Sequence, residues 1–235
     1  MRKLSPARSL LFFLEELEYS EAALSADPLT TDLAPPFHSR TEEWNGVFQR
    51  ERLARRAVVR ADAVVAVRNN LLDTLTKRFS AVVLAEAGGE RKSSFFKRFF
   101  AEAPSDFIAR PLREQCERTR DKLIPEIEKQ PDDSPLKSFA DRLRAHVKDA
   151  LSALTARAKS RGENASAADD VTDWKEGVQK LRAVTYAELL KIAAEKNLSR
   201  DWAETFFRSE GSDATSVEEE SPAPAPTPMP APNDG

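Results

Sequence analysis

The sequence predicts an all-α protein, and two observations carry this prediction. Gly accounts for only 7 of 235 residues, whereas Ala, Arg, Leu and Glu are abundant, a composition that favours helix over sheet. In addition, the chain has no Gly or Pro between Gly46 and Gly88, and apolar residues recur there at helical spacing. We therefore predict an antiparallel helical bundle organised around one long helix at about residues 42–86.

The long helix is predicted to begin at Thr41, which is followed by Glu42 and Glu43, and to stop at Gly88-Gly89. At 1.5 Å per residue, a helix of about 45 residues spans about 70 Å, so several later segments must dock along it. Its predicted apolar face is formed by Val47, Ala54, Ala61, Val65, Leu72, Leu75, Phe79 and Val83.

Before the long helix we predict an N-terminal helix within residues 1–25 and a linker over 26–40. Ser5-Pro6 is a suitable N-cap and first-turn pair for that helix. The apolar run Leu10–Leu14 ends at Glu15 and is too short for an export signal or for the roughly 20 residues that span a membrane. We therefore interpret it as a packing helix and predict no transmembrane segment.

Residues 41–208, which include the long helix, are predicted to form one helical bundle domain. Pro125 should kink or end one helix, Ser134-Pro135 should open the next, and Asn197 should break another. The small and polar residues 161–171 are predicted to form a loop. The further helices are predicted at about 93–103, 111–129, 134–160, 173–196 and 199–207.

The charges are distributed unevenly along the chain. Residues 41–160 contain 24 Lys and Arg and 18 Asp and Glu, whereas residues 209–235 contain six acids and no Lys or Arg. The latter segment is also rich in Pro and Ala, so it cannot bury enough apolar surface to fold. We predict a disordered acidic C-terminal tail at 209–235.

We predict no catalytic, cofactor-binding or metal site. The sequence has two His and one Cys, and it lacks the metal-binding and phosphate-binding motifs HExxH, CxxC and Gly-rich loops. We interpret His146 as a surface residue and Cys116 as a packed one, with a reactive thiol as the weaker alternative for Cys116. A single cysteine excludes an internal disulfide framework and fits a reducing compartment, so we expect a cytoplasmic protein.

Arg68 is a candidate for a buried ion pair. It falls in the middle of the apolar face of the long helix, between Val65 and Leu72, where an unpaired charge would be costly. Its neighbours four residues away are Val64 and Leu72, so a partner must come from another helix. The alternatives are that its side chain reaches the edge of the bundle or that it binds a ligand.

Two basic segments are candidate interaction sites. The first is a ridge on the early half of the long helix, which could follow a phosphate backbone or an anionic lipid surface. The second interleaves bases with aromatic rings, as stacking platforms and interfacial helices do. These candidate residues are Arg52, Arg56 and Arg60 in the ridge, and Phe95, Phe96, Lys97, Arg98, Phe99 and Phe100 in the aromatic segment.

The Phe-rich segment allows three interpretations: a plug at the end of the bundle, a dimer contact or a membrane foot. Four Phe in six residues could bury several hundred Å², and a monomer seldom leaves so large an apolar patch bare. We favour the plug, because Gly88-Gly89 and Pro104 form turns that would fold the segment back onto Phe79 and Val83.

The sequence therefore predicts a non-enzymatic, intracellular helical interaction or scaffold module of unknown partner, with self-association left open. The alternative is a protein that binds nucleic acid or an anionic membrane through the ridge and the Phe-rich segment. An enzyme ranks third. Salt-sensitive binding to heparin or duplex DNA would distinguish the alternative from the leading hypothesis.

Overall fold

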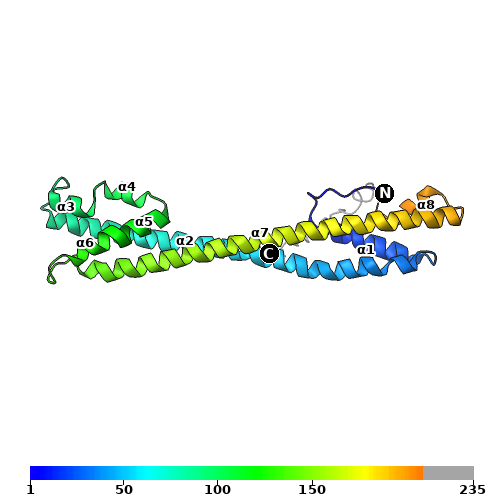
Figure 1. The fold of residues 1–235 in the computed structure, drawn as a ribbon, viewed down its shortest axis with the longest axis horizontal. Helices are drawn as coiled ribbons and strands as arrows, with labels where there is room; N and C mark the ends of the chain where they lie inside the picture. The colour runs from blue at the N-terminus through cyan, green and yellow to red at the C-terminus, as the bar shows by residue number, and fades with distance from the viewer. Residues whose placement is uncertain (209–235) are drawn as a thin grey trace, which may run out of the picture. The chain divides into compact units, whose positions relative to one another are not determined.

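A computed structural model describes residues 1–208, and within this range every regular element is a helix. The predicted all-α class is confirmed (Figure 1). The predicted tail at 209–235 lies outside the described residues. The chain divides into two compact units: one contains residues 1–41 together with the chain from Val178 on, and the other contains residues 42–177.

The first unit contains α1 (Leu10–Ala26), the 3-10 turn η1 (Thr31–Leu33), the first residues of α2 and the last residues of α7, and α8 (Arg200–Glu204). Ser9 caps α1 by accepting a hydrogen bond from the Phe12 amide at 3.1 Å, so this helix starts four residues later than the Ser5-Pro6 pair suggested. Phe13, Leu17 and Leu24 are fully buried on one side of α1. The N-terminal helix thus docks within this unit.

A buried ion pair joins α1 to α7 inside this unit. Arg182 Nη1 lies 2.6 Å from Glu16 Oε2, and each side chain is only 1% exposed. The Arg182 guanidinium also lies 5.0 Å from the centre of the Phe207 ring. Burial lowers the pKa of Arg182, whereas Glu16 opposes this effect. Removing either partner would leave an uncompensated buried charge, so this pair fixes how α1 packs on α7.

The second unit is built on α2 (Pro35–Glu86) and α7 (Ser138–Glu195), each of which contributes residues to both units. Here the two helices run antiparallel, because residues late in α2 pair with residues early in α7. Arg50 bonds to Asp170 at 2.5 Å, Asp62 to Arg161 at 3.0 Å, and Arg68 to Asp149 at 3.0 Å. The long helix and its antiparallel partner are therefore present as predicted.

Short helices cover one stretch of this pair: α3 (Ser94–Phe99), α4 (Pro104–Ile108), α5 (Leu112–Arg118), the π-helical turn η2 (Thr119–Leu123) and α6 (Ile124–Glu128). Together with α2 and α7 they enclose a hydrophobic core, and we call residues 65–154 the core section. Phe79 lies among the rings of Phe99, Phe100 and Phe139, with centroids 5.4–5.9 Å away. The remaining core side chains include Leu72, Leu75, Val83, Leu123, Ile127, Leu136, Leu143 and Val147.

Several predicted ends are confirmed and have clear physical causes. α2 ends at Glu86, and Gly88 and Gly89 follow with φ of 66° and 82°, a conformation that residues with a Cβ rarely adopt. Asn197 ends the next long helix with φ of 56°, which Asn tolerates better than most residues. Ser199 then caps α8 by accepting a hydrogen bond from the Trp202 amide at 3.3 Å.

The predicted interruption near Pro125 also occurs. Instead of one helix over 111–129, the chain forms α5, the π-turn η2 and α6, and Pro125 lies in the first turn of α6. Proline has no amide hydrogen and its ring crowds the carbonyl four residues earlier, here that of Asp121. The wider π-turn directly before Pro125 accommodates this conflict.

The predicted loop at 161–171 is wrong, because α7 continues through it as a single helix from Ser138 to Glu195. The predicted helices 134–160 and 173–196 are two parts of this element. Gly162 weakens a helix by about 1 kcal/mol relative to Ala. Contacts with α2 offset this cost: Ala167 is 2% exposed, and Arg161 and Asp170 are paired with Asp62 and Arg50.

Three further boundaries differ from the prediction. α2 begins at Pro35 rather than near residue 42, because Pro35 and Pro36 suit a first helical turn and Phe37 is fully buried. The predicted linker at 26–40 is therefore partly helical. α3 spans only 94–99, since Phe100 is extended, and α7 starts after a turn at residues 134–137.

Candidate interaction surface on the long helix

The part of the second unit that lacks short helices has very little core. We call residues 42–64 of α2 and 155–177 of α7 the two-helix section. Within these two ranges only Ala167 and Trp174 are buried, and no residue of α2 is. Two helices alone cannot enclose an apolar interior, so both faces of this section are open to solvent or to a partner.

The exposed side of α2 carries its own apolar seam. Positions 53, 57, 60, 64, 67 and 71 alternate steps of four and three residues, the spacing at which one helix packs against another. Four of these positions hold large apolar side chains that are 41–59% exposed. We call this set, Leu53, Val64, Val67 and Leu71, the outer stripe.

Two hollows lie along the outer stripe. A groove of about 450 Å³ is lined by Leu53 and Ala57 of α2 and by Glu163 and Asp170 of α7, among others. A second hollow of about 400 Å³ is lined by Ala63, Val64, Val67 and Arg68. The stripe is thus an indented apolar surface with charged edges, which is the shape that receives side chains of another helix.

The ridge residues Arg52, Arg56 and Arg60 are all exposed. Arg60 occupies one position of the seam, and the other two lie beside it on the helix surface. Residues 50–60 contain five Arg and one acid, whereas residues 161–177 of α7 contain five acids, one Arg and one Lys. The two helices therefore present opposite charges side by side, and the Arg50–Asp170 ion pair joins them.

The Phe-rich segment lies elsewhere, on α3 in the core section. Phe96, Phe99 and Phe100 are 2–5% exposed, and their rings pack on Phe79 and Phe107 or on one another. Phe95 is half-buried, Lys97 and Arg98 are exposed, and the Arg98 guanidinium lies 4.9 Å from the centre of the Phe95 ring. This is the arrangement that the plug interpretation predicts, and it leaves Lys97 and Arg98 as the accessible part of the segment.

Arg68 forms an ion pair with another helix, but the pair is not buried. Its Nη1 lies 3.0 Å from Asp149 Oδ2, and the two side chains are 38% and 46% exposed. The prediction of a buried ion pair at Arg68 is therefore wrong, although the predicted partner on another helix is present. Arg68 lies at the edge of the α2–α7 contact. Its guanidinium group reaches solvent, while the start of its side chain stays on the helix face between Val65 and Leu72.

The other titratable side chains that the sequence singled out are Cys116, His38 and His146. Cys116 is fully buried, and burial raises the pKa of its thiol to about 11, so it is protonated at neutral pH. His38 contacts Glu21 at 2.9 Å on the surface, and His146 is half-buried. Among residues 1–208, no group of three or more His, Cys, Asp or Glu side chains could hold a metal ion.

No helix within residues 1–208 is both long enough and apolar enough to cross a membrane. Comparisons with protein-family models, curated proteins and solved structures found no match to this chain.

Sequence reasoning missed the outer stripe, although the signal for it was present. Three of the four stripe residues precede a residue of the predicted inward apolar face by one position: Leu53 precedes Ala54, Val64 precedes Val65, and Leu71 precedes Leu72. The apolar face predicted from the sequence was only the inward one, and the seam at positions 53–71 lies about 100° away from that face around the same helix. Two heptad seams on one helix indicate two helical neighbours rather than one.

Proposed function

We propose that this protein is a non-enzymatic helical interaction module that associates with a second copy of itself through the outer stripe. The exposure of four large apolar side chains at helix-packing spacing is the observation that carries the proposal. With a second copy, the two-helix section becomes a four-helix bundle, which encloses the interior that two helices cannot.

Charge complementarity supports a second copy as the occupant. If the axis of two-fold symmetry runs parallel to the helices, α2 of each copy lies against α7 of the other, antiparallel and at the same level. Within one chain Arg50 already pairs with Asp170 and Asp62 with Arg161 at these levels. Across copies, the same register brings Arg52 and Arg56 near Asp169 and Glu163, so opposite charges face each other.

The available surface is large enough for a stable dimer. Residues 42–71 of α2 extend about 45 Å at 1.5 Å per residue, and two adjacent helices are about 20 Å wide. The face therefore covers about 900 Å², compared with about 800 Å² per partner in a standard protein interface. We further propose a cytoplasmic location, which is compatible with the single, unpaired thiol of Cys116.

Sedimentation or light scattering of the full chain over a range of concentrations tests the proposal. We expect a dimer that Val64→Glu with Val67→Glu converts to a folded monomer, because the two carboxylates would be buried unpaired. Val59→Ser is the control: Val59 is 67% exposed and lies about 120° around α2 from the outer stripe, and Ser adds no charge beside Arg52 and Arg56, so association should persist. A parent chain that stays monomeric at all concentrations would refute the proposal.

Charge reversal tests the arrangement of the two copies. Arg56→Glu and Glu163→Arg should each weaken self-association, and a mixture of the two variants should recover it as a heterodimer. Equal self-association by both single variants and the parent would rule out this arrangement. An alternative result would support nucleic-acid binding through the ridge: immobilised duplex DNA retains the parent with a steep salt dependence but does not retain the double variant Arg52→Gln, Arg56→Gln.

A further inference from the structure

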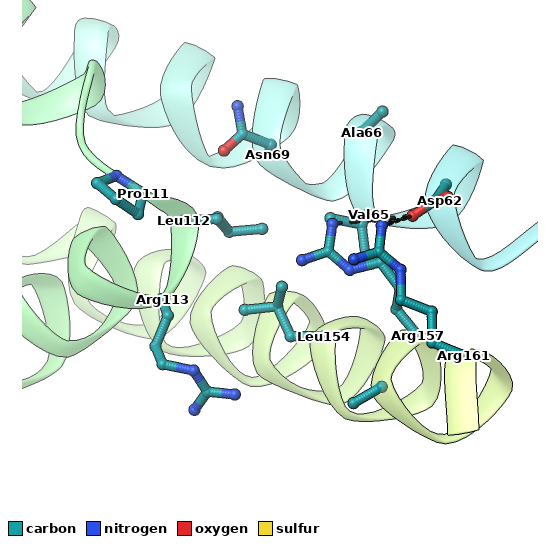
Figure 2. A pocket seen from close by; sticks show the side chains of 11 residues that line it. Asp62, Val65, Ala66, Asn69, Pro111, Leu112, Arg113, Leu154, Arg157 and Arg161 are labelled. Atoms are coloured by element: carbon teal, nitrogen blue, oxygen red, sulfur yellow. Dashed lines mark hydrogen bonds and ion pairs between the residues drawn. The ribbon is translucent and has the colours of Figure 1, made fainter. Parts of the chain in front are cut away.

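A second surface feature lies on the other side of α2 and is unrelated to the outer stripe. A pocket of about 790 Å³ forms within the core section and the adjoining part of the two-helix section, lined by α2, α5 and α7 (Figure 2). Its α2 residues include Asp62 and Asn69. Asp62 is two positions from Val64 of the outer stripe and Asn69 is two positions from Val67, and two positions correspond to about 200° around the helix. Pockets of this volume are typical of sites for small organic ligands.

The bottom of the pocket is apolar. Val65 of α2, Leu112 of α5 and Leu154 of α7 line it and are each 7–9% exposed. Figure 2 shows these three side chains converging between the helices. An apolar group on a ligand could therefore lose contact with water there, and each buried CH₂ would contribute about 0.8 kcal/mol.

The rim of the pocket is cationic. Arg113 lies at the α5 end, and Arg157 and Arg161 lie at the opposite end, beside Asp62 (Figure 2). Three guanidinium groups and one carboxylate leave an excess of two positive charges. Arg161 bonds to Asp62 at 3.0 Å and Arg157 approaches it at 3.9 Å, whereas Arg113 makes no ion pair within residues 1–208.

Asn69 is fixed at the wall by a chain of hydrogen bonds. Its Nδ2 donates to Asp73 Oδ2 at 3.0 Å, and Gln115 Nε2 donates to Asp73 Oδ1 at 2.7 Å. Gln115 is fully buried and belongs to α5, so the hydrogen bonds join the two helices on either side of the pocket. The wall is therefore held in position before a ligand arrives, which lowers the entropic cost of binding.

We infer that this pocket binds an amphipathic anion, a small molecule with a carboxylate or phosphate head and an apolar body. The head lies between the guanidinium groups of Arg157 and Arg161, which approach the same Asp62 carboxylate and each offer several N–H donors in a plane. The apolar body lies on Val65, Leu112 and Leu154. Asp62 acts against binding, because its carboxylate repels the anion and engages two of the three Arg side chains.

Calorimetric titration of the full chain with decanoate and with decyl phosphate tests this inference. We expect both to bind at one site per chain and decanol to bind more weakly, and the ratio of the two affinities identifies the preferred head group. Absence of binding by both anions at millimolar concentration, or equal binding of decanol, would overturn the inference.

Substitutions in the rim give effects of opposite sign. Arg157→Gln and Arg161→Gln should each weaken decanoate binding by about tenfold, the loss expected for one charge-assisted contact. Asp62→Asn should tighten it, because it removes a negative charge and releases two guanidinium groups. Arg78→Gln, an exposed Arg of α2 outside the pocket, is the matched control.

Decanoate binding to the pocket should not depend on self-association. The Val64→Glu, Val67→Glu variant should bind decanoate as the parent does, since those residues do not line the pocket. Binding that is unchanged by Arg157→Gln, Arg161→Gln and Asp62→Asn would show that decanoate adheres elsewhere, and would overturn the site.

Discussion

The core section and the two-helix section are made from the same pair of helices, yet only one of them has a hydrophobic interior. In the core section, α3 to α6 cover α2 and α7 and bury side chains such as Phe79, which contacts three other aromatic rings. In the two-helix section, only Ala167 and Trp174 are buried. The apolar spacing of α2 continues through both, so the difference lies in what covers the helix.

This difference separates stability from interaction. Burial of apolar side chains supplies most of the free energy of folding, so the core section stabilises the unit. The two-helix section and the first turns of α2 in the core section keep exposed apolar side chains, Leu53, Val64, Val67 and Leu71, and these are available to a partner. Substitutions should therefore cause large losses of stability in the first region and small changes in the second.

The largest expected effect is in the core section. Phe96→Ser with Phe100→Ser removes two side chains that are 3% and 2% exposed, and should destabilise the protein by about 5 kcal/mol or more, given about 3–5 kcal/mol for each Phe→Ala. Thermal melting followed by circular dichroism measures this loss, which should appear at every protein concentration.

Val59→Ser in the two-helix section is the control, with an expected change within about 0.5 kcal/mol because Val59 is 67% exposed. If the Phe double variant melts like the parent, α3 does not plug the core. Loss of self-association with an unchanged melting temperature would instead make the Phe rings a dimer contact, as one of the sequence-based hypotheses allowed.

Much of the core section could be predicted from the sequence because its signals are local and strong. The pair Gly88-Gly89 stops α2, Pro125 interrupts a helix, and the Phe pairs fold back onto Phe79. Each depends on a backbone restriction or on aromatic side chains too large to leave exposed. Such features do not depend on knowing which distant helix packs nearby.

The two-helix section and the ligand pocket could not be predicted in the same way. Residues 161–171 have weak helix signals at Gly162 and Asn164, and contacts with α2 decide their conformation. Likewise, Arg113 is 44 residues from Arg157 in sequence, and only the packing of α5 beside α7 brings both to one pocket. Local spacing contains no information on such pairs.

A smaller, stabilising effect is expected in the two-helix section. Gly162 lies inside α7, has no positive φ, and a Cβ added there would meet no heavy atom within 4 Å. Gly162→Ala should therefore stabilise the protein by about 0.5–1 kcal/mol, because Ala has less conformational freedom to lose on folding. Urea titration measures the gain, and a loss of stability would mean that residues 161–171 are not helical in solution.

The smallest expected effect is at Arg68, on the edge between the two regions. From the sequence, a buried ion pair at this position predicts a loss of about 3–5 kcal/mol for Arg68→Ala. The Arg68–Asp149 pair is 38% and 46% exposed, and exposed pairs contribute about 0.2–1 kcal/mol because water and salt screen them. A double-mutant cycle with Asp149→Ala measures the coupling, which should decrease further in 1 M salt.

The Glu16–Arg182 pair is the matched contrast, since both side chains are 1% exposed and removal of one should cost several kcal/mol at any salt concentration. A coupling at Arg68 as large as the one at Arg182 would show that another chain covers this edge, and its dependence on protein concentration would identify the outer-stripe dimer as that cover.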